Sequence, residues 1–595
     1  MDPRAPQDSM PPSPTPNPES QPSRKGANRR QFLGRMGVAA AAAGVVGNLP
    51  KAVAKTAAGA TRPSVNGNAV TGISAQARVQ NAYNIRVANA TADLAATIPP
   101  HTTSGDEARY SDKSASYAKP LLQDGIGLVN LGAWASFKKA LSTGLMSDYE
   151  NIILGGTRTL NGPQGSYAYD LESLDSAQFG NARSVNDPTG LPLVPPFDQI
   201  NSTYYGAQLI ELYWASLLRD VAFTDYGGNT IADAAVAELQ SLGSAYRGPR
   251  DAHGNVTTDL LFRGTYQGER IGPYMSQFAI TPTSFGAQPM SMQCTTYMPG
   301  IDYMTDPTTF LQVQNGISTG LTNQIDPVSR TMHDGRGLAA YTHVDVLYQA
   351  YFMGLVTMLG MGVPGNPGNP YAASKTQNGF CTFGGPDFAA TVGEVAARAL
   401  QKVWYQKWLV HLTHRPEAGG GVLRQILQGQ GNTIQATLNS NVLNSQAVQQ
   451  SFAKYGDYFL SCAFPEGSPA HPSYPTGHGT VGGACITILK FFFDGSYVIP
   501  NPVVPSNDGL SVLPYTGADA GQITVAGELN KLAHNITFGH GIHAGIHWRE
   551  DSDKSMLLGE AMALSYLQER APTYNEKFTI QIQRLDGSIA TITNQ

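Results

Sequence analysis

The sequence has 595 residues, more than most single domains, so the chain can bury a large core as two fused domains or as one enlarged domain. A formal net charge of −5, with no long run of lysine or arginine in the body, excludes the electrostatic signature of a nucleic-acid-binding protein and favours a small-molecule site. The four cysteines (Cys294, Cys381, Cys462 and Cys485) lack CxxC spacing, which indicates neither a zinc cage nor a disulfide-dependent scaffold, although one or two disulfides are allowed.

The N-terminal segment has the pattern of a targeting sequence. A Pro- and Ser-rich leader precedes Arg29-Arg30, an Ala-rich apolar run and the small residues Ala52-Val53-Ala54. This order is typical of a twin-arginine signal, so we expect 1–54 to be a disordered leader and signal, and the protein to be exported to the periplasm or beyond the cell. The alternative is a chance arginine pair. No other stretch has about 18 uninterrupted apolar residues, which argues against a membrane-embedded body.

Helical periodicity dominates the rest of the chain. Ile210, Trp214, Leu217 and Val221 recur at the spacing of one buried helix face. Similar patterns predict helices near 73–97, 335–360, 387–413, 445–460, 480–494 and 552–569, joined by Gly/Pro/Asn-rich connections at 222–232, 245–258, 362–387 and 496–522. Alternating apolar residues on either side of Asp586-Gly587 predict a small β-hairpin at 571–595. The sequence therefore predicts a mainly α fold with long loops.

Eight of the twelve histidines lie between positions 411 and 547, so a functional site is expected there. Its first element runs from Lys407 to Glu417. The pattern begins as a helix and Pro416 disfavours a helical Arg415, so we expect Lys407 and Arg415 about two turns apart, with the arginine at the helix end. Two such cations can converge on one oxoanion. The alternative is a solvated basic helix face.

The second element ends in Pro475-Thr476-Gly477-His478 and precedes an apolar run at 480–493. Prolines favour an extended approach and Gly477 permits a close turn, so that N–H groups at a helix start can bind an anion. His478 would reach the same place as an acid or base. The alternative is an ordinary proline-rich loop with a capping histidine.

The third element, Phe538–Asp551, contains Gly545-Ile546-His547. If it is helical, His547 and Asp551 are i,i+4 neighbours, and the carboxylate orients the imidazole and makes it a better ligand or nucleophile. The alternative is a surface contact between two helical side chains.

The order of these three elements resembles the vanadium haloperoxidase family, which shares its site with acid phosphatases of the phosphatidic-acid-phosphatase superfamily. The likeness is greatest to algal bromoperoxidases and extends to segments far from the motifs: Leu154–Gly156, Glu211–Val221, Gly272–Phe278 and Phe310–Gly316. It covers roughly 120–570. We therefore expect an N-terminal helical extension at 55–120 and a haloperoxidase-like helical-bundle domain at 121–570.

The resemblance implies vanadate as the cofactor, bound at one end of the bundle through a single histidine nitrogen. That histidine corresponds to His547, and Asp551 corresponds to the carboxylate that contacts the histidine. Lys407 and Arg415 correspond to cations that hold the vanadate oxygens, and Lys407 would also polarise the bound peroxide.

The remaining pocket residues follow from the same resemblance. Thr476 and Gly477 stand in place of the family's serine and glycine, with the Gly477 N–H as a donor, and His478 corresponds to the acid–base histidine. His471 lies seven residues before His478, where bromoperoxidases carry histidine, and Trp404 lies three before Lys407, where algal enzymes place tryptophan. Bromide and iodide are therefore the expected substrates. The alternative for His471 and Trp404 is simple pocket lining.

The implied activity is halide oxidation by hydrogen peroxide without redox change at the metal. A cationic pocket withdraws electron density from the peroxide, a halide attacks one peroxide oxygen, and the released hypohalous acid halogenates small organic compounds.

One position departs from the family. An arginine normally stands four residues before the glycine of Gly-x-His, and here that residue is Gly541. His540 or His543 can replace the missing donor; we favour His540, and the spacing from Phe538 indicates one inserted residue. Loss of a guanidinium from an anion site costs about 1.5–3 kcal/mol, which weakens vanadate binding about ten- to hundredfold.

Two other functions fit parts of the pattern. An acid phosphatase would use the same pocket, with His547 attacking phosphorus and His478 protonating the leaving oxygen. A non-catalytic oxoanion-binding protein is suggested by the missing arginine. Relatives often form homo-oligomers, which we also expect here.

Overall fold

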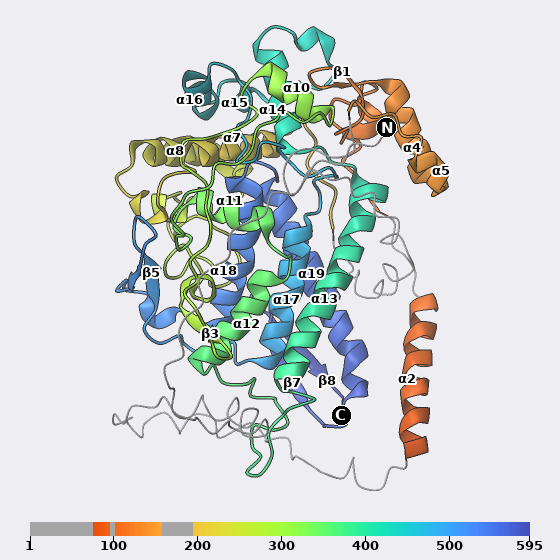
Figure 1. Cartoon of the computed structure of the whole chain (residues 1–595), viewed down its shortest axis with the longest axis vertical. Coiled ribbons are helices and arrows are strands. Elements are labelled where there is room, and N and C mark those ends of the chain that lie inside the picture. The colour runs from red at the N-terminus through yellow and green to blue at the C-terminus, as the bar shows by residue number, and fades with distance from the viewer. Residues whose placement is uncertain (1–74, 96–100, 157–193, 595) are drawn as a thin grey trace, which may run out of the picture. The chain divides into compact units, whose positions relative to one another are not determined.

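The computed structural model describes residues 75–95, 101–156 and 194–594, all within the unit Lys55–Gln595. Figure 1 shows that helices are the main secondary structure of the described residues. The expected leader and twin-arginine signal at 1–54 lie outside the described residues. The predicted mainly α fold with long loops is confirmed.

The helices, in chain order, are α2 (Ala75–Ala95), α3 (Asp106–Arg109), α4 (Leu131–Thr143), α5 (Met146–Tyr149), α7 (Thr203–Leu217), α8 (Thr230–Ser241), α9 (Gln277–Ile280), α10 (Pro307–Gln314), α11 (Gly335–Val344), α12 (Gln349–Met361), α13 (Gly385–Tyr405), α14 (Pro416–Leu427), α15 (Ser440–Leu443), α16 (Gln446–Tyr455), α17 (Gly477–Phe492), α18 (Val525–Phe538) and α19 (Arg549–Arg570). Two π-helical turns, Gln406–His411 and Gly539–His543, extend α13 and α18. Short 3-10 turns lie at Phe223–Asp225, Gly243–Ala245, Thr258–Leu260, Gly431–Thr433, Ala520–Gln522 and Ala571–Thr573.

Within the described ranges, strands occur only as four antiparallel pairs. They are β1 (Gln123–Gly125) with β2 (Leu128–Val129), β3 (Thr283–Phe285) with β4 (Gln288–Met290), β5 (Val503–Pro505) with β6 (Val512–Pro514), and β7 (Thr579–Gln583) with β8 (Ile589–Thr593). The last pair is the predicted C-terminal hairpin, with Thr579 opposite Thr593 and Gln583 opposite Ile589.

The helix predicted over 335–360 is two helices. Asp345 has extended backbone angles (φ −70°, ψ 154°), so α11 ends there, and α12 leaves at an angle of 107°. The turn puts the residues after α11 beside the start of α17, where the Leu347 side chain comes near Gly477.

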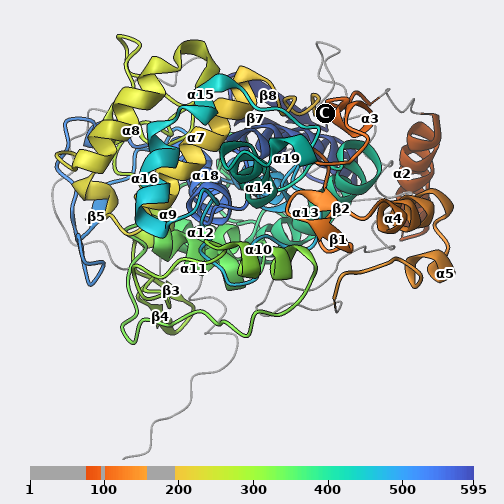
Figure 2. The same cartoon turned by 90° about the horizontal axis from the view of Figure 1, so that it is seen from above.

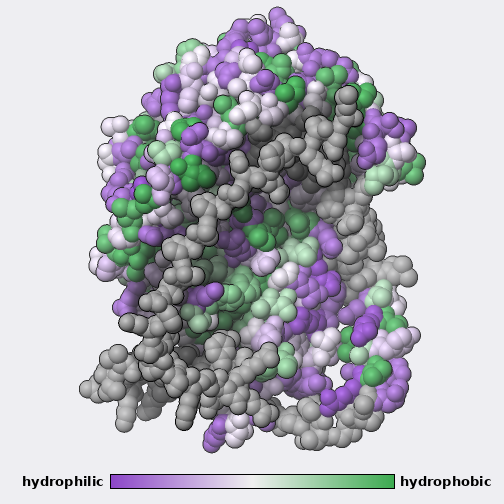
Figure 3. All heavy atoms as spheres, viewed as in Figure 1, coloured by the Kyte–Doolittle hydropathy of each residue, from purple (hydrophilic) through white to green (hydrophobic). Residues whose placement is uncertain are grey.

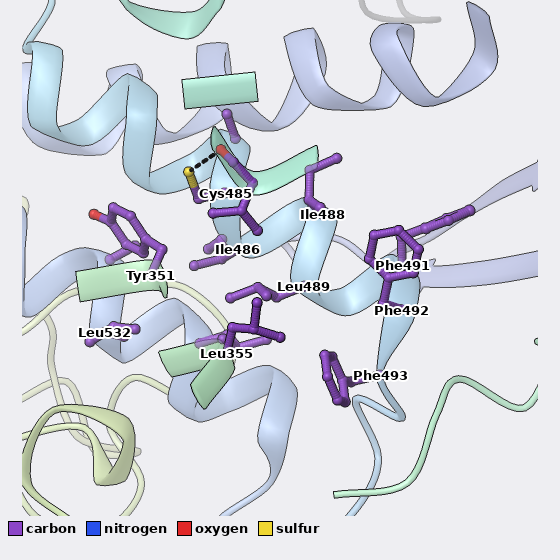
Figure 4. Close-up of a cluster of buried hydrophobic side chains, with 14 of the residues drawn as sticks. Tyr351, Leu355, Cys485, Ile486, Ile488, Leu489, Phe491, Phe492, Phe493 and Leu532 are labelled. Atoms are coloured by element: carbon purple, nitrogen blue, oxygen red, sulfur yellow. Dashed lines mark hydrogen bonds between the residues drawn. The ribbon is translucent and has the colours of Figure 1, made fainter. Parts of the chain in front are cut away.

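Helix α17 is the centre of the bundle, since all its residues are buried. It packs against α13, α18 and α19. Figure 1 shows it between α18 and α13, and Figure 2 shows α13, α18 and α19 from above. Residues Cys485 to Phe493 pack against Tyr351 and Leu355 of α12 and Leu532 of α18, and the Cys485 thiol faces the Val392 carbonyl at 3.7 Å (Figure 4). Burial of each large apolar side chain contributes about 1.5–3 kcal/mol.

Glycines hold α17 and α19 close together. A Cβ on Gly483 would clash with the Met556 carbonyl, and one on Gly559 would clash with the Thr480 carbonyl. Because Gly479 lies against Ser552 and Gly483 against Met556, the two helices run parallel and begin side by side. Their N-termini therefore meet at one end of the bundle.

Figure 3 shows hydrophilic and hydrophobic residues interleaved on the visible face. In the described part of the chain no single helix is long and apolar enough to cross a membrane, and α11 with α12 meets those criteria only as a bent pair. All four cysteines are free, so no disulfide is present among them.

Candidate active site

The three predicted elements meet where α14, α17 and α19 begin. Arg415 joins them: its Nη1 lies 2.6 Å from His547 Nε2, and its Nη2 lies 3.0 Å from His471 Nδ1. The same guanidinium donates to the carbonyl oxygens of Ile546 (3.1 Å) and His471 (3.0 Å). Residues that are 132 positions apart thus form one buried cluster around Arg415, which is the candidate anion pocket.

Arg415 does not end the helix that carries Lys407. That helix finishes in the π-helical turn Gln406–His411, and Leu412 then adopts a left-handed conformation (φ 44°). Arg415 is extended (φ −82°, ψ 158°) and immediately precedes α14. The expected helix-end position is therefore wrong, although Pro416 does impose the expected non-helical backbone.

Lys407 is fully buried, and its ammonium donates to the carbonyl oxygens of Pro472 and Ser473, each at 2.7 Å. Burial, and then the charge of Arg415, hold the pKa of Lys407 well below its usual value. An ammonium has three N–H donors, so one remains for an anion after these two bonds. An anion in the pocket would restore the pKa of Lys407.

Thr476 and Gly477 form the start of α17. Thr476 is extended and caps the helix, and its N–H donates to Ser555 Oγ of α19 at 2.7 Å. Its hydroxyl is buried and has no hydrogen-bond partner among the described residues. The positive end of the α17 dipole and this open hydroxyl together favour an anion at the helix start.

His547 and Asp551 form a close pair. His547 Nδ1 lies 2.6 Å from Asp551 Oδ2, and the same oxygen accepts from Ser473 Oγ and from the Trp548 N–H at 3.2 Å. His547 itself precedes α19, whose N-cap is Trp548, so the expected arrangement of both residues inside one helix is wrong. Burial raises the pKa of Asp551 to about 6, against the opposing effects of Ser473, Lys407 and Arg415.

His540 lies in the pocket and His543 does not. The His540 ring stacks on His478, with centroids 3.9 Å apart, and lies 5.4 Å from the His547 ring. His543 Nε2 instead contacts the Tyr274 hydroxyl at 2.9 Å. A Cβ on Gly541 would lie 3.1 Å from His547 Cβ, so position 541 also faces the pocket.

A π-helical turn explains the spacing in this segment. Gly539–His543 is π-helical, and such a turn holds one more residue than an α-helical turn. This agrees with one inserted residue after Phe538. The extra residue brings a histidine beside His478.

Two further rings line the pocket. The Trp404 ring lies 4.6 Å from the ring of His471, and Lys407 Nζ lies 6.0 Å from the Trp404 ring. Trp404 and Leu400 are also the side chains nearest to the open side of Gly477, together with Leu347.

Sequence reasoning missed three residues of the site. Asp345 lies 3.0 Å from His478 Nε2, Ser473 bonds Asp551, and Ser555 accepts from Thr476. Ser473 lies inside the second predicted element and could have been considered. No sequence signal links Asp345 to a histidine 133 positions later.

The pocket carries more positive than negative charge. Burial is the first cause that lowers the pKa of Lys407, Arg415, His471, His540 and His547, and repulsion from neighbouring cations adds to it in each case except Arg415. The Asp551 carboxylate opposes this effect at Lys407 and Arg415, and Glu417 also raises the pKa of Arg415. No group of three or more His, Cys, Asp or Glu side chains in the described part of the chain could hold a metal cation. The donor set instead fits an oxoanion.

Comparison with known proteins gave a consistent result. No family model matches the chain. The chain is 29% identical over 593 residues to a vanadium-dependent bromoperoxidase of Corallina pilulifera, covering 87% of this chain and 99% of that protein. It is 30% identical over 532 residues to one of Ascophyllum nodosum, covering 86% and 92%. The solved structure of the homohexameric vanadate-dependent bromoperoxidase AnII from Ascophyllum nodosum matches with a TM-score of 0.78 at 26% identity, over 93% of this chain and 95% of that one.

Proposed function

The chain belongs to the vanadium-dependent bromoperoxidase family, and from this we propose that it oxidises bromide and iodide with hydrogen peroxide to hypohalous acid, which then halogenates small organic compounds. The observation that carries the proposal is the buried cationic pocket around the His547–Asp551 pair. Vanadate supplies, when bound, an electrophilic centre that activates hydrogen peroxide.

His547 would hold vanadate through Nε2. Asp551 accepts the hydrogen bond from Nδ1, which leaves the lone pair on Nε2, the nitrogen that points toward Arg415. Arg415, Lys407, the Thr476 hydroxyl and the Gly477 N–H would neutralise and orient the oxygens. His540 would take the place of the family's third-element arginine.

His478 would move the proton of the incoming peroxide. Asp345 engages Nε2 of His478, so Nδ1 is the nitrogen left to accept or return a proton. His471 and Trp404 lie beside these groups and would form the wall past which the halide approaches.

The cellular setting and the assembly are also proposals. The twin-arginine pattern at Arg29-Arg30 supports export. The homohexameric relative supports a homo-oligomer for this chain.

Halide oxidation by the purified full chain tests this function. We expect iodide and bromide oxidation that requires added vanadate, is lost in His547→Ala and is kept in His253→Ala, which changes an exposed histidine outside the pocket. No oxidation at saturating vanadate would refute the function. Hydrolysis of p-nitrophenyl phosphate without vanadate would favour a phosphatase, and vanadate binding without turnover a non-catalytic binding protein.

A further inference from the structure

A second cavity, of about 300 Å³, is formed by loops outside the vanadate pocket. Its lining comes from residues 223–226, 258–275 and 504–519, with His333. Four aromatic rings line its walls, namely Phe223, Tyr226, Tyr274 and Tyr515. A volume of about 300 Å³ is at the lower end of the range for small-molecule sites.

Arg263 gives this cavity a charge that the protein does not neutralise with an ion pair. Six arginines in the described part of the chain are buried, and four of them form ion pairs with carboxylates: Arg219 with Asp302, Arg336 with Asp220, Arg424 with Asp457 and Arg549 with Glu211. The other two are Arg415, in the vanadate pocket, and Arg263. A buried arginine without an ion pair to a carboxylate thus occurs both in the vanadate pocket and in the second cavity.

The surroundings of Arg263 favour an anion. Its side chain donates through Nη2 to the carbonyl oxygens of Gly272 (3.1 Å) and Pro273 (3.0 Å), while Nε has no acceptor among the described residues. Burial lowers the pKa of Arg263 and outweighs the opposing effects of Tyr274, Glu528, Tyr515 and Asp519, none of which forms an ion pair with it. At Arg549 the paired Glu211 carboxylate outweighs burial and raises the pKa. A buried guanidinium without a counter-ion is unfavourable, and an anionic ligand relieves this cost.

The other charged groups of the cavity leave room for such a ligand. Asp519 is engaged on both oxygens, by the Gly272 N–H at 2.6 Å and the Tyr515 hydroxyl at 2.7 Å. Asp259 is exposed. Arg270 is also exposed and forms no ion pair within the described ranges, so it adds a second guanidinium at the edge of the cavity.

We propose that this cavity binds a small aromatic carboxylate, with its ring against the aromatic walls and its carboxylate on Arg263. A guanidinium matches a carboxylate in plane and charge, and aromatic rings favour an aromatic ligand. Phe223 and Tyr274 already stack, with centroids 3.7 Å apart, and present a flat apolar wall. This site does not depend on vanadate chemistry.

Calorimetric titration of the full chain with benzoate tests the proposal. We expect one saturable site, with cyclohexanecarboxylate and benzyl alcohol each bound at least about tenfold more weakly, because one lacks the aromatic ring and the other the charge. The affinity should be the same with and without saturating vanadate, since the two sites are separate. Displacement of benzoate by vanadate would place it in the Arg415 pocket and overturn the proposal.

Three variants locate the site. Val504→Trp fills the cavity from β5 and should abolish benzoate binding, Arg263→Gln should do the same, and Arg270→Gln should weaken binding about threefold or more. Halide oxidation should be unchanged in Val504→Trp and Arg270→Gln, which also shows that they are folded. Benzoate binding that survives Val504→Trp, or no binding by the unaltered chain at millimolar benzoate, would overturn the proposal even if Arg263→Gln does not fold.

Discussion

His478 Nε2 lies 3.0 Å from Asp345 Oδ1, although the two residues belong to different helices. The Asp345 side chain is 2% exposed, and its backbone ends α11. One residue therefore both turns the chain and orients the histidine at the start of α17.

Replacing this carboxylate tests its positioning role. We expect Asp345→Asn to lower kcat/KM for bromide oxidation about 10- to 100-fold and to shift the pH profile, because an amide cannot replace the charge-assisted hydrogen bond that orients the His478 imidazole. Vanadate affinity should change less than kcat. Asp233→Asn, which alters an exposed carboxylate, serves as the control. An unchanged pH profile would show that Asp345 only supports the fold.

The open hydroxyl of Thr476 provides a test at the helix start. Thr476→Val should weaken vanadate binding about fivefold to tenfold, because a neutral hydrogen bond contributes about 1 kcal/mol. The apo protein should be as stable as before or more so, since the buried hydroxyl has no partner among the described residues. Thr476→Ser should keep normal affinity. Reconstitution of the apo protein with vanadate, together with urea denaturation, measures both effects, and equal affinity in all three proteins would contradict the assignment.

His540 can be tested as the substitute for the family arginine. His540→Ala should weaken vanadate binding about tenfold, and His540→Arg should preserve or strengthen it, because a guanidinium is a stronger partner for an oxoanion. His253→Ala is the matched control. If His540→Ala retains full affinity, the missing arginine has no replacement at this position.

The buried histidines predict a loss of stability in acid. Burial lowers the pKa of His411 to about 3, and neither ring nitrogen has a hydrogen-bond partner in the described part of the chain. In the unfolded chain His411 takes up a proton near pH 6.5, so its effect on stability is absent above that pH and grows as pH falls toward 3. At pH 5, protonation of His411 in the unfolded chain lowers the free energy of unfolding by about 2 kcal/mol.

His411→Phe should remove this cost. The ring packs edge-on against Tyr474, 4.8 Å away, so phenylalanine fits the same space. Urea denaturation should therefore show a smaller decrease in the free energy of unfolding between pH 7 and 5 for His411→Phe than for the original chain or for His253→Phe. Parallel pH dependence in all three would contradict the prediction.

The sequence predicted the helical class and the three elements of the site, because periodicity and motif spacing are local properties. Contacts across the chain were not predictable in this way. The expected positions of Arg415 and His547 were wrong for the same reason: each was expected within a helix that in fact ends or begins between the paired residues. Leu412, with its left-handed backbone, carries no residue type that signals such a turn.

Some residues of the site come from segments that lie far apart in the sequence. Asp345 reaches the site from the turn after α11, and Ser555 reaches it from α19, which packs against α17; no single segment encodes these contacts. The spacing after Phe538 indicated one inserted residue, but the π-helical turn that contains it was not predicted, and its geometry decides which histidine points toward His478.

The glycine contacts between α17 and α19 have a consequence for engineering. Both helices begin at the pocket, and the glycine contacts fix the position of one helix along the axis of the other. This position sets the distance from Thr476 to Asp551. A methyl group at Gly483 or Gly559 would shift one helix relative to the other. The anion-binding groups at the start of α17 would then no longer be aligned with those at the start of α19. Glycine-to-alanine substitutions intended to stabilise the bundle should therefore avoid the contact between α17 and α19. Substitutions in the long connecting loops should disturb the site less.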